Sequence, residues 1–289
     1  MNTHKVNVDS VEEWDMEITP NNGLFNLHLK EVWAYRDLVW LFFRRDFVSF
    51  YKQTIFGPIW LFVQPIFTTI TFTIIFSRLA KISTEDIPPP LFYLSGNIAW
   101  NYFSDCLGKT SSVFATNAGI FGKVYFPRLI MPLTTIFSNL VRFLIQFILF
   151  ICMIIFFNLK GFHIFPNLYV LLFPVIILLM SILGLGLGMI ISGLTTKYRD
   201  LNFLVGFGVN LLMYATPIIY PLSAAPAKYR LYITLNPLSG LIETFRYGFT
   251  GKGIFSLNAF VYSVVASLVF FFLGLVVFNK VEKTFIDTV

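Results

Sequence analysis

Six apolar segments constrain this chain more than any other feature of its sequence. A helix needs about 20 apolar residues to cross the hydrocarbon core of a bilayer. The sequence meets or approaches that length at 58–80, 89–108, 131–157, 168–193, 202–221 and 258–279. We therefore predict an all-α membrane protein with six transmembrane helices.

The composition excludes an ordinary soluble fold. Hydrophobic residues make up 56% of the 289-residue chain and charged residues only 12%, whereas about a quarter of a soluble domain is charged. Too little polar surface remains to coat a water-soluble globule. The weaker apolar segments are 89–108, which carries Asn97, Asn101 and Asp105, and 202–221, where Pro217 predicts a kink buried against protein.

The basic residues indicate the topology. Six spans place both termini on one side, and the segments on that side hold 13 of the 21 Lys and Arg residues, against seven on the other side and Arg142 within a span. The positive-inside rule then places both termini in the cytosol. The net charge of +6 is explained by this bias and does not indicate nucleic acid binding. The acidic start of the chain has no apolar core, so we do not expect it to act as a signal peptide.

Residues 30–52 form an amphipathic pattern when placed on a helical wheel. One face is basic, the other is apolar, and only Asp46 interrupts the apolar face. This pattern predicts a helix in the inner membrane interface, although a cytosolic helix packed on a soluble domain would look similar. The basic face of this interface helix holds Lys30, Arg44, Arg45 and Lys52.

The domain organisation follows from these segments. We predict a polar cytosolic segment at 1–29, the interface helix at 30–52, a six-span domain at 53–280 and a cytosolic tail at 281–289. The long outer connection at 221–257 is only partly apolar and predicts short re-entrant helices that do not cross the bilayer, with a seventh span as the alternative. Within this connection, Glu243 and Arg246 have the i,i+3 spacing of a helical ion pair.

The glycines of the fourth apolar segment have the spacing of a packing surface. Gly184, Gly186, Gly188 and Gly193 lie deep in an apolar run, and no strand precedes them. We expect them to allow close helix packing and not to bind a nucleotide.

Motifs for catalysis or energy coupling are absent from the sequence. It has no phosphate-binding loop, no metal-ligand spacing and no nucleophile motif. We therefore expect no catalytic residue, metal or cofactor in this chain. A membrane-embedded transferase would need an acid/base or metal cluster, and an ion-driven carrier would need midplane carboxylates and inverted repeats. A chain built like a transporter without its own energy source indicates an external motor.

Arg142 is the basic residue inside an apolar span. An intramembrane arginine is a candidate functional residue. The alternative is a structural pair with a helix carbonyl or with Asp105 on the neighbouring span.

Three stretches resemble a known family. They read RRDFVSFYKQTIFGPIWLFVQP, TTKYRDLNFLVGFGVNLLMYATPIIYP and LNPLSGLIETFRYGFTG. They resemble the membrane subunits of type-2 ABC exporters, in particular those for bacterial polysaccharides such as O antigen, capsule and teichoic acid. The resemblance covers nearly all of 30–280.

The resemblance carries functional expectations. It implies a homodimer in the bacterial inner membrane that encloses a channel for an undecaprenyl-linked polysaccharide. Two copies of a separate cytosolic subunit would bind ATP and Mg and supply the hydrolysis. A teichoic-acid, drug or lipid exporter of the same superfamily is the alternative.

Two sets of residues follow as candidates. Residues of the inner loops, most of them basic or aromatic, are expected to contact the ATPase, although lysine, arginine and tyrosine also suit anchoring in lipid headgroups. They are Asn117, Phe121, Lys123, Tyr125, Phe126, Arg128, Tyr198, Arg199 and Asp200. Aromatic faces and replaceable hydrogen bonds suit a sliding sugar polymer, and we expect channel-lining roles for Trp60, Gln64, Tyr93, Asn97, Trp100, Asn101 and Arg142. Many aromatic residues must instead face lipid.

Overall fold

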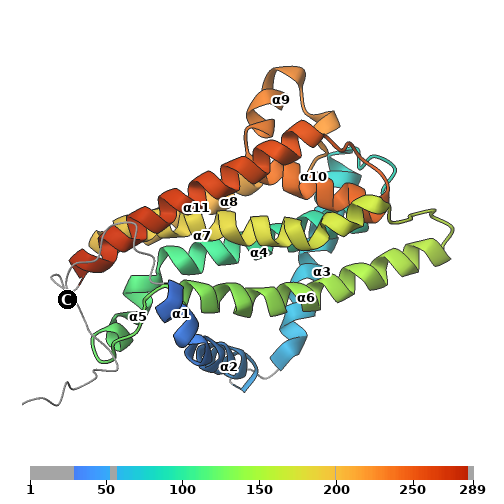
Figure 1. The fold of residues 1–289 in the computed structure, drawn as a ribbon. Helices are drawn as coiled ribbons and strands as arrows, with labels where there is room; N and C mark the ends of the chain where they lie inside the picture. Colours follow the sequence, from blue (N-terminus) through green and yellow to red (C-terminus); the bar gives the residue numbers. More distant parts are fainter. Residues whose placement is uncertain (1–28, 53–56, 199, 286–289) are drawn as a thin grey trace, which may run out of the picture.

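The computed structural model describes residues 29–52, 57–198 and 200–285, and every regular element in these ranges is a helix (Figure 1). The all-α prediction is therefore confirmed for this part of the chain. The predicted segment 1–29, except its last residue, lies outside the described residues, as does the end of the predicted tail at 286–289.

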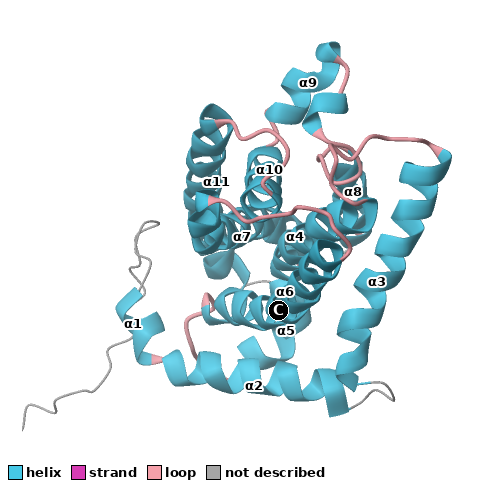
Figure 2. Ribbon diagram, turned by 90° about the vertical axis from the view of Figure 1, so that its right-hand side faces the viewer, coloured by secondary structure: helices cyan, strands magenta, loops and turns pink. Residues whose placement is uncertain are grey.

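The amphipathic segment folds as two helices separated by a turn at Tyr35, α1 (Leu29–Ala34) and α2 (Arg36–Lys52). α2 crosses beneath the long helices (Figure 2) and packs on α6 (Ile130–Leu159). Phe42 is its buried anchor, whereas Trp33 and Trp40 are 72% and 67% exposed. A helix with one anchored face and exposed indoles has the form expected of an interface helix.

Four helices are long and apolar enough to cross a membrane, and each matches a predicted span. They comprise Trp60–Leu79, Ile130–Leu159, Leu168–Lys197 and Leu257–Val281. The first follows the short turn η1 (Gly57–Ile59) and joins α3 (Trp60–Phe72) to the π-helical η2 (Thr73–Leu79). The third joins η3 (Leu168–Leu172) to α7 (Phe173–Lys197), and the last lies within α11 (Leu257–Phe285).

The other two predicted spans differ from this group. α4 (Pro89–Ser111) is long enough, but polar residues make it less apolar, and it is buried along most of its length. α8 (Leu201–Tyr214) is apolar but shorter than the predicted 202–221, so the expectation of helix up to residue 221 was wrong. The chain turns at 215–220, where Pro217 cannot donate a backbone hydrogen bond. The six-span count stays a prediction.

α7 is the centre of the bundle, with α4 on one side and α11 on the other. A Cβ on Gly188 would lie 2.9 Å from the carbonyl oxygen of Leu107 in α4. A Cβ on Gly186 would lie 2.6 Å from the backbone of Phe270 in α11, and one on Gly274 would lie 2.5 Å from the Gly186 oxygen. The packing role predicted for these glycines is therefore confirmed.

Short helices occupy the predicted re-entrant region: η4 (Leu222–Ala224), α9 (Ala227–Thr234) and α10 (Pro237–Thr250). α10 is almost wholly buried and packs on α11 and η3. Asn236 caps its start, and Gly251, with a φ of +67°, ends it in the left-handed conformation that favours glycine. α9 projects beyond the bundle (Figure 1).

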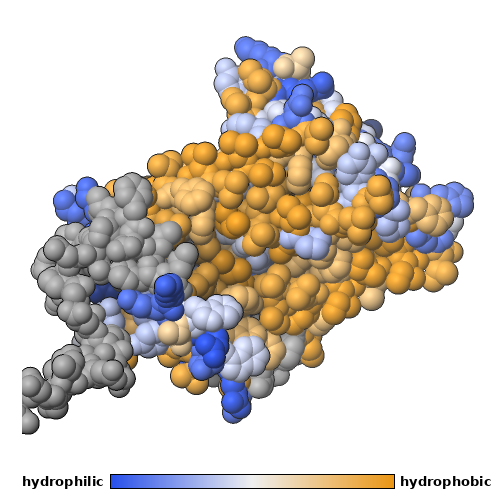
Figure 3. Space-filling view, viewed as in Figure 1, coloured by the Kyte–Doolittle hydropathy of each residue, from blue (hydrophilic) through white to orange (hydrophobic). Residues whose placement is uncertain are grey.

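Polar and apolar regions of the surface are separated along the long axis of the bundle. Apolar side chains cover the sides of the long helices, and polar side chains gather around α9 near one end and around α2 nearer the other (Figure 3). An apolar band of this kind is what a bilayer would cover.

Candidate functional site

A polar groove lies between α2, α3, α4 and α6. It consists of two adjoining pockets of about 380 and 220 Å³ that share Leu61 and Arg142. The larger, which we call the Lys109 pocket, is lined by Asp46, Phe47, Ser49, Leu61, Lys109, Thr135, Ser138 and Arg142. The smaller, which we call the Trp60 pocket, is lined by Trp60, Leu61, Gln64, Asn101, Tyr102, Asp105, Asn139, Arg142, Phe143 and Gln146.

The groove brings together four of the seven predicted channel-lining residues. Trp60 and Gln64 lie on consecutive turns of α3, Asn101 comes from α4 and Arg142 from α6. Their elements bring an indole ring, two carboxamides and a guanidinium to one wall of the protein. Such a surface can contact sugar rings and exchange hydrogen bonds with hydroxyl groups.

The other three residues predicted to line the channel are buried in the interior of the protein. Tyr93, Asn97 and Trp100 are 0%, 4% and 4% exposed. The Tyr93 ring packs against Phe72, with ring centroids 6.1 Å apart. Within the described residues, the Tyr93 hydroxyl and the Asn97 amide nitrogen have no hydrogen-bond partner. The channel role of these three residues stays a prediction.

Charged groups meet at the junction of the two pockets. Arg142 Nη1 lies 3.9 Å from Asp105 Oδ2, an ion pair that the sequence offered as one alternative to a functional role for Arg142. Lys109 Nζ donates a 2.6 Å hydrogen bond to Asn139 Oδ1. Lys109 lies one residue beyond the predicted span 89–108, in the last turn of α4.

Sequence reasoning missed two features of the groove. Asn139, Arg142 and Gln146 have the i,i+3,i+7 spacing of one face of α6, a readable signal in an otherwise apolar helix. Asp46 interrupts the apolar face of α2 because it lines the Lys109 pocket, where it also pairs with Arg45 at 2.8 Å. Both patterns can be read in the sequence, but the sequence does not show which residues of the other helices face them across the groove.

The predicted ATPase-contact residues divide into an exposed and an internal group. Phe126 and Arg128 are 5% and 8% exposed, and Arg128 lies over the Phe121 ring at 5.5 Å. Phe126 packs between Phe121, the last residue of α5 (Val113–Phe121), and Phe42 of α2, with ring centroids 5.6 and 5.8 Å away. Asn117 donates to the Val113 carbonyl within its own helix at 2.9 Å.

The exposed group lies in the connections that follow the C-terminal ends of α5 and α7: Lys123, Tyr125, Tyr198 and Asp200. Tyr125 and Tyr198 are 56% and 51% exposed. Arg199, which was predicted to act with them, lies outside the described residues. The basic residues predicted for the interface helix, Lys30, Arg44, Arg45 and Lys52, are all exposed. Contact with an ATPase stays a prediction for all of them.

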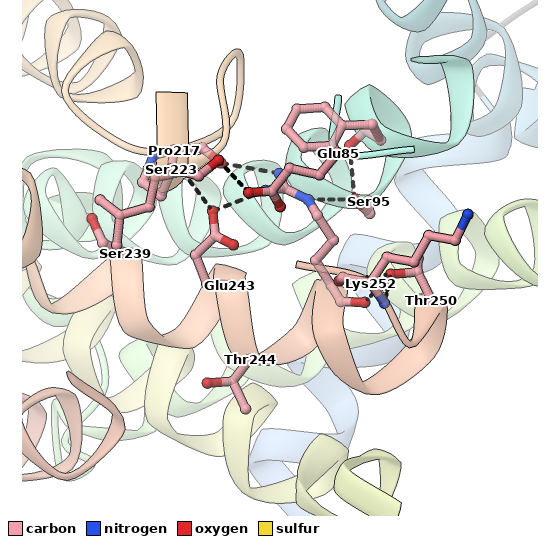
Figure 4. A network of polar contacts seen from close by, with 12 residues as sticks. Glu85, Ser95, Pro217, Ser223, Ser239, Glu243, Thr244, Thr250 and Lys252 are labelled. Carbon is pink, nitrogen blue, oxygen red and sulfur yellow. Dashed lines mark hydrogen bonds and ion pairs between the residues drawn. The ribbon is translucent and has the colours of Figure 1, made fainter. Parts of the chain in front are cut away.

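A buried network fixes the opposite end of the bundle (Figure 4). Arg246 is 0% exposed, and its Nη1 lies 3.1 Å from Glu243 Oε1, which confirms the predicted i,i+3 pair. The same guanidinium donates to Ser95 Oγ at 3.3 Å and to the Pro217 carbonyl at 3.0 Å. Arg246 thereby ties α10 to α4 and to the turn after α8.

The fold and the groove define a class: a multi-pass, α-helical membrane protein with a groove lined by polar residues. The sequence matches the ABC-2 type transporter family over residues 37–250, and the chain belongs to that family.

Several characterised proteins are similar along most of the chain. It is 27% identical to the O-antigen export system permease protein RfbA of Klebsiella pneumoniae, over 87% of this chain and 94% of the relative. It is 26% identical to the protein of the same name from Myxococcus xanthus, over 75% and 82% of the two chains. It is 24% identical to the polysialic acid transport protein KpsM of Escherichia coli, over 85% and 94%.

Proposed function

We propose that this chain is the channel-forming permease subunit of an ATP-driven exporter that moves undecaprenyl-linked, O-antigen-like polysaccharide across the bacterial inner membrane. The observation that carries this proposal is the polar groove, which lies among apolar helices and presents Trp60 beside amide side chains. Membership of the ABC-2 type transporter family supports an export role. The similar proteins are named for O antigen and polysialic acid, and both names favour a polysaccharide over a drug or lipid.

The proposed topology has six crossings, with α10 as a re-entrant helix and both termini in the cytosol. Contacts between connections support it. Ser223 Oγ donates to Glu85, and Lys252 Nζ donates to the Asp86 carbonyl at 2.8 Å. Asn167 N donates to the carbonyl of Gly248, in the last turn of α10 before the connection 251–256, at 2.9 Å. The connections 80–88, 160–167, 215–236 and 251–256 therefore meet at one end of the bundle, which we assign to the outer face.

The motor in this proposal is a separate subunit present in two copies, bound to a homodimer of the permease. ATP and Mg would be held by that subunit. The docking surface would lie at the end of the bundle opposite the outer connections, where four predicted residues are accessible: Lys123, Tyr125, Tyr198 and Asp200. Phe121, Phe126 and Arg128 would transmit the contact to α2, because Phe126 packs on Phe42 with ring centroids 5.8 Å apart.

The sugar path is tested with a matched pair of aromatic substitutions on α3. Trp60 lines the groove, whereas Phe67, 65% exposed on the same helix, does not. We expect Trp60→Ala to lower the polymer at the cell surface several-fold and to leave lipid-linked polymer inside, and Phe67→Ala to preserve export. Both variants should insert to wild-type levels. Unchanged export by Trp60→Ala would show that the polymer does not pass along the groove.

A further inference from the structure

The Lys109 pocket differs chemically from the Trp60 pocket beside it. Helices α4 and α6 bring the Lys109 ammonium and the Arg142 guanidinium to its wall, together with Ser138. The Trp60 pocket is lined mainly by aromatic and amide groups. The groove therefore has a cationic compartment next to a compartment suited to neutral sugars.

The carboxylates near the Lys109 pocket already form ion pairs with arginines. Asp46 accepts two hydrogen bonds from Arg45, at 2.8 and 3.0 Å, and Asp105 lies beside Arg142. Among the described residues, Lys109 forms no ion pair with a carboxylate, and its ammonium is held in place by the neutral Asn139. An ammonium has three N–H donors, so the bond to Asn139 leaves two of them for a ligand.

The Ser138 hydroxyl adds a neutral donor. Its oxygen is buried and has no hydrogen-bond partner among the described residues. A buried hydroxyl of this kind usually has a partner in the functional state. The pocket thus offers an ammonium, a guanidinium and a hydroxyl, which together match an anion with several acceptor oxygens.

The apolar surroundings indicate what carries the anion. Phe47 and Leu61 line the same pocket, and the apolar helix α3, which carries Leu61, also exposes Ile66 and Ile70. A small, fully hydrated ion would gain nothing from these side chains. An amphiphile can place its head among the cations and its hydrocarbon chain along α3.

We propose that the Lys109 pocket binds the phosphate group of a lipid-anchored molecule, with Lys109, Arg142 and Ser138 as donors. Two sources share this chemistry: an anionic phospholipid, and the phosphate that joins a lipid carrier to its sugar. In the second case, which rests on the proposed export function, the adjoining Trp60 pocket would receive the first sugars. The groove would then recognise the lipid–sugar junction.

Binding is measured by calorimetry on the full-length chain purified in dodecyl maltoside, a detergent whose head is a neutral sugar. The probes are farnesyl phosphate, as a short carrier analogue, and dihexanoyl phosphatidylglycerol. Dihexanoyl phosphatidylcholine tests whether a net negative charge is needed. We expect the two anionic probes to bind with higher affinity than the zwitterion.

Lys109→Gln is the decisive variant, because glutamine still has a donor for Asn139 while the charge is lost. We expect it to weaken farnesyl phosphate binding about tenfold, the usual effect of losing one charge-assisted hydrogen bond. Ser138→Ala should weaken binding less, and Arg142→Lys should retain part of it. Arg78→Gln is the control, because Arg78 is exposed near the other end of the α3–η2 span and lines neither pocket.

Competition separates the two sources. Displacement of farnesyl phosphate by phosphatidylglycerol at equal concentration identifies a general phospholipid site, and resistance to displacement identifies a carrier site. Equal binding by wild type and Lys109→Gln, or equal affinity for phosphatidylcholine, overturns the proposal. The proposed function would survive that result if export still depended on Trp60 and on the ATPase.

Discussion

The contact between α7 and α11 gives a prediction whose size follows from the structure. The two backbones meet at Gly186 and Gly274, so that neither position has room for a methyl group. A Cβ on Gly186 would lie 2.6 Å from the carbonyl carbon and oxygen of Phe270 and from the nitrogen of Phe271. Carbon atoms pack best at about 3.5–4.0 Å, so Gly186→Ala requires the helices to separate by roughly 1 Å.

The energetic effect combines two opposing contributions. Inserting a methyl group into a packed core costs about 1–3 kcal/mol, and the upper end applies because the obstructing atoms belong to a helix backbone that cannot rotate away. Replacing glycine by alanine within a helix returns up to about 1 kcal/mol. We therefore expect Gly186→Ala to lower the free energy of unfolding by about 2 kcal/mol.

The control for this prediction is Gly206→Ala in α8. No atom lies within 4 Å of a Cβ built there, so the helix gain acts alone and the variant should be neutral or slightly stabilised. Both variants are compared in dodecyl maltoside by titration with sodium dodecyl sulfate, followed by tryptophan fluorescence. Equal stability of the two variants would refute the close contact between α7 and α11.

Two further predictions concern the ends of the bundle. Arg246→Gln leaves Glu243 buried without its cation and should destabilise the protein by about 3–5 kcal/mol. Adding Glu243→Gln should recover much of this loss. A double variant as unstable as Arg246→Gln alone would contradict the coupling between the two residues. Tyr125→Ala should reduce co-purification with the ATPase at unchanged stability, whereas Phe126→Ala should destabilise the fold by about 3 kcal/mol because it leaves a cavity beside Phe42. Normal co-purification of Tyr125→Ala with the ATPase would show that Tyr125 is not part of the docking surface.

The sequence predicts the helices of this protein well because lipid imposes a simple rule. Apolar runs of about 20 residues have few alternatives to a spanning helix, so the elements built around 58–80, 131–157, 168–193 and 258–279 appear where expected. α8 ends at Tyr214, before Pro217, the residue whose position in the sequence predicted a kink. The path of the chain after that turn was not predicted, because the Pro217 carbonyl accepts a hydrogen bond from Arg246, 29 residues further along the chain.

The candidate site was only partly predictable for the same reason. The polar stripe at Asn97, Asn101 and Asp105 marks one face of α4, but the helices packed around α4 bury Asn97. Burial therefore separates Asn97 from Asn101, which lines the groove, although the two have equivalent spacing. Pairing across helices, as between Lys109 and Asn139, depends on the arrangement of the bundle and had no signal along the chain.

The central claim is that this chain provides a path and takes its energy from a separate ATPase. The direct test uses vesicles that contain lipid-linked polysaccharide and either the purified chain alone or the chain together with its ATPase subunit. The account predicts ATP hydrolysis and movement of the polymer across the bilayer only when both subunits are present. ATP-dependent movement of the polymer by the chain alone would contradict it.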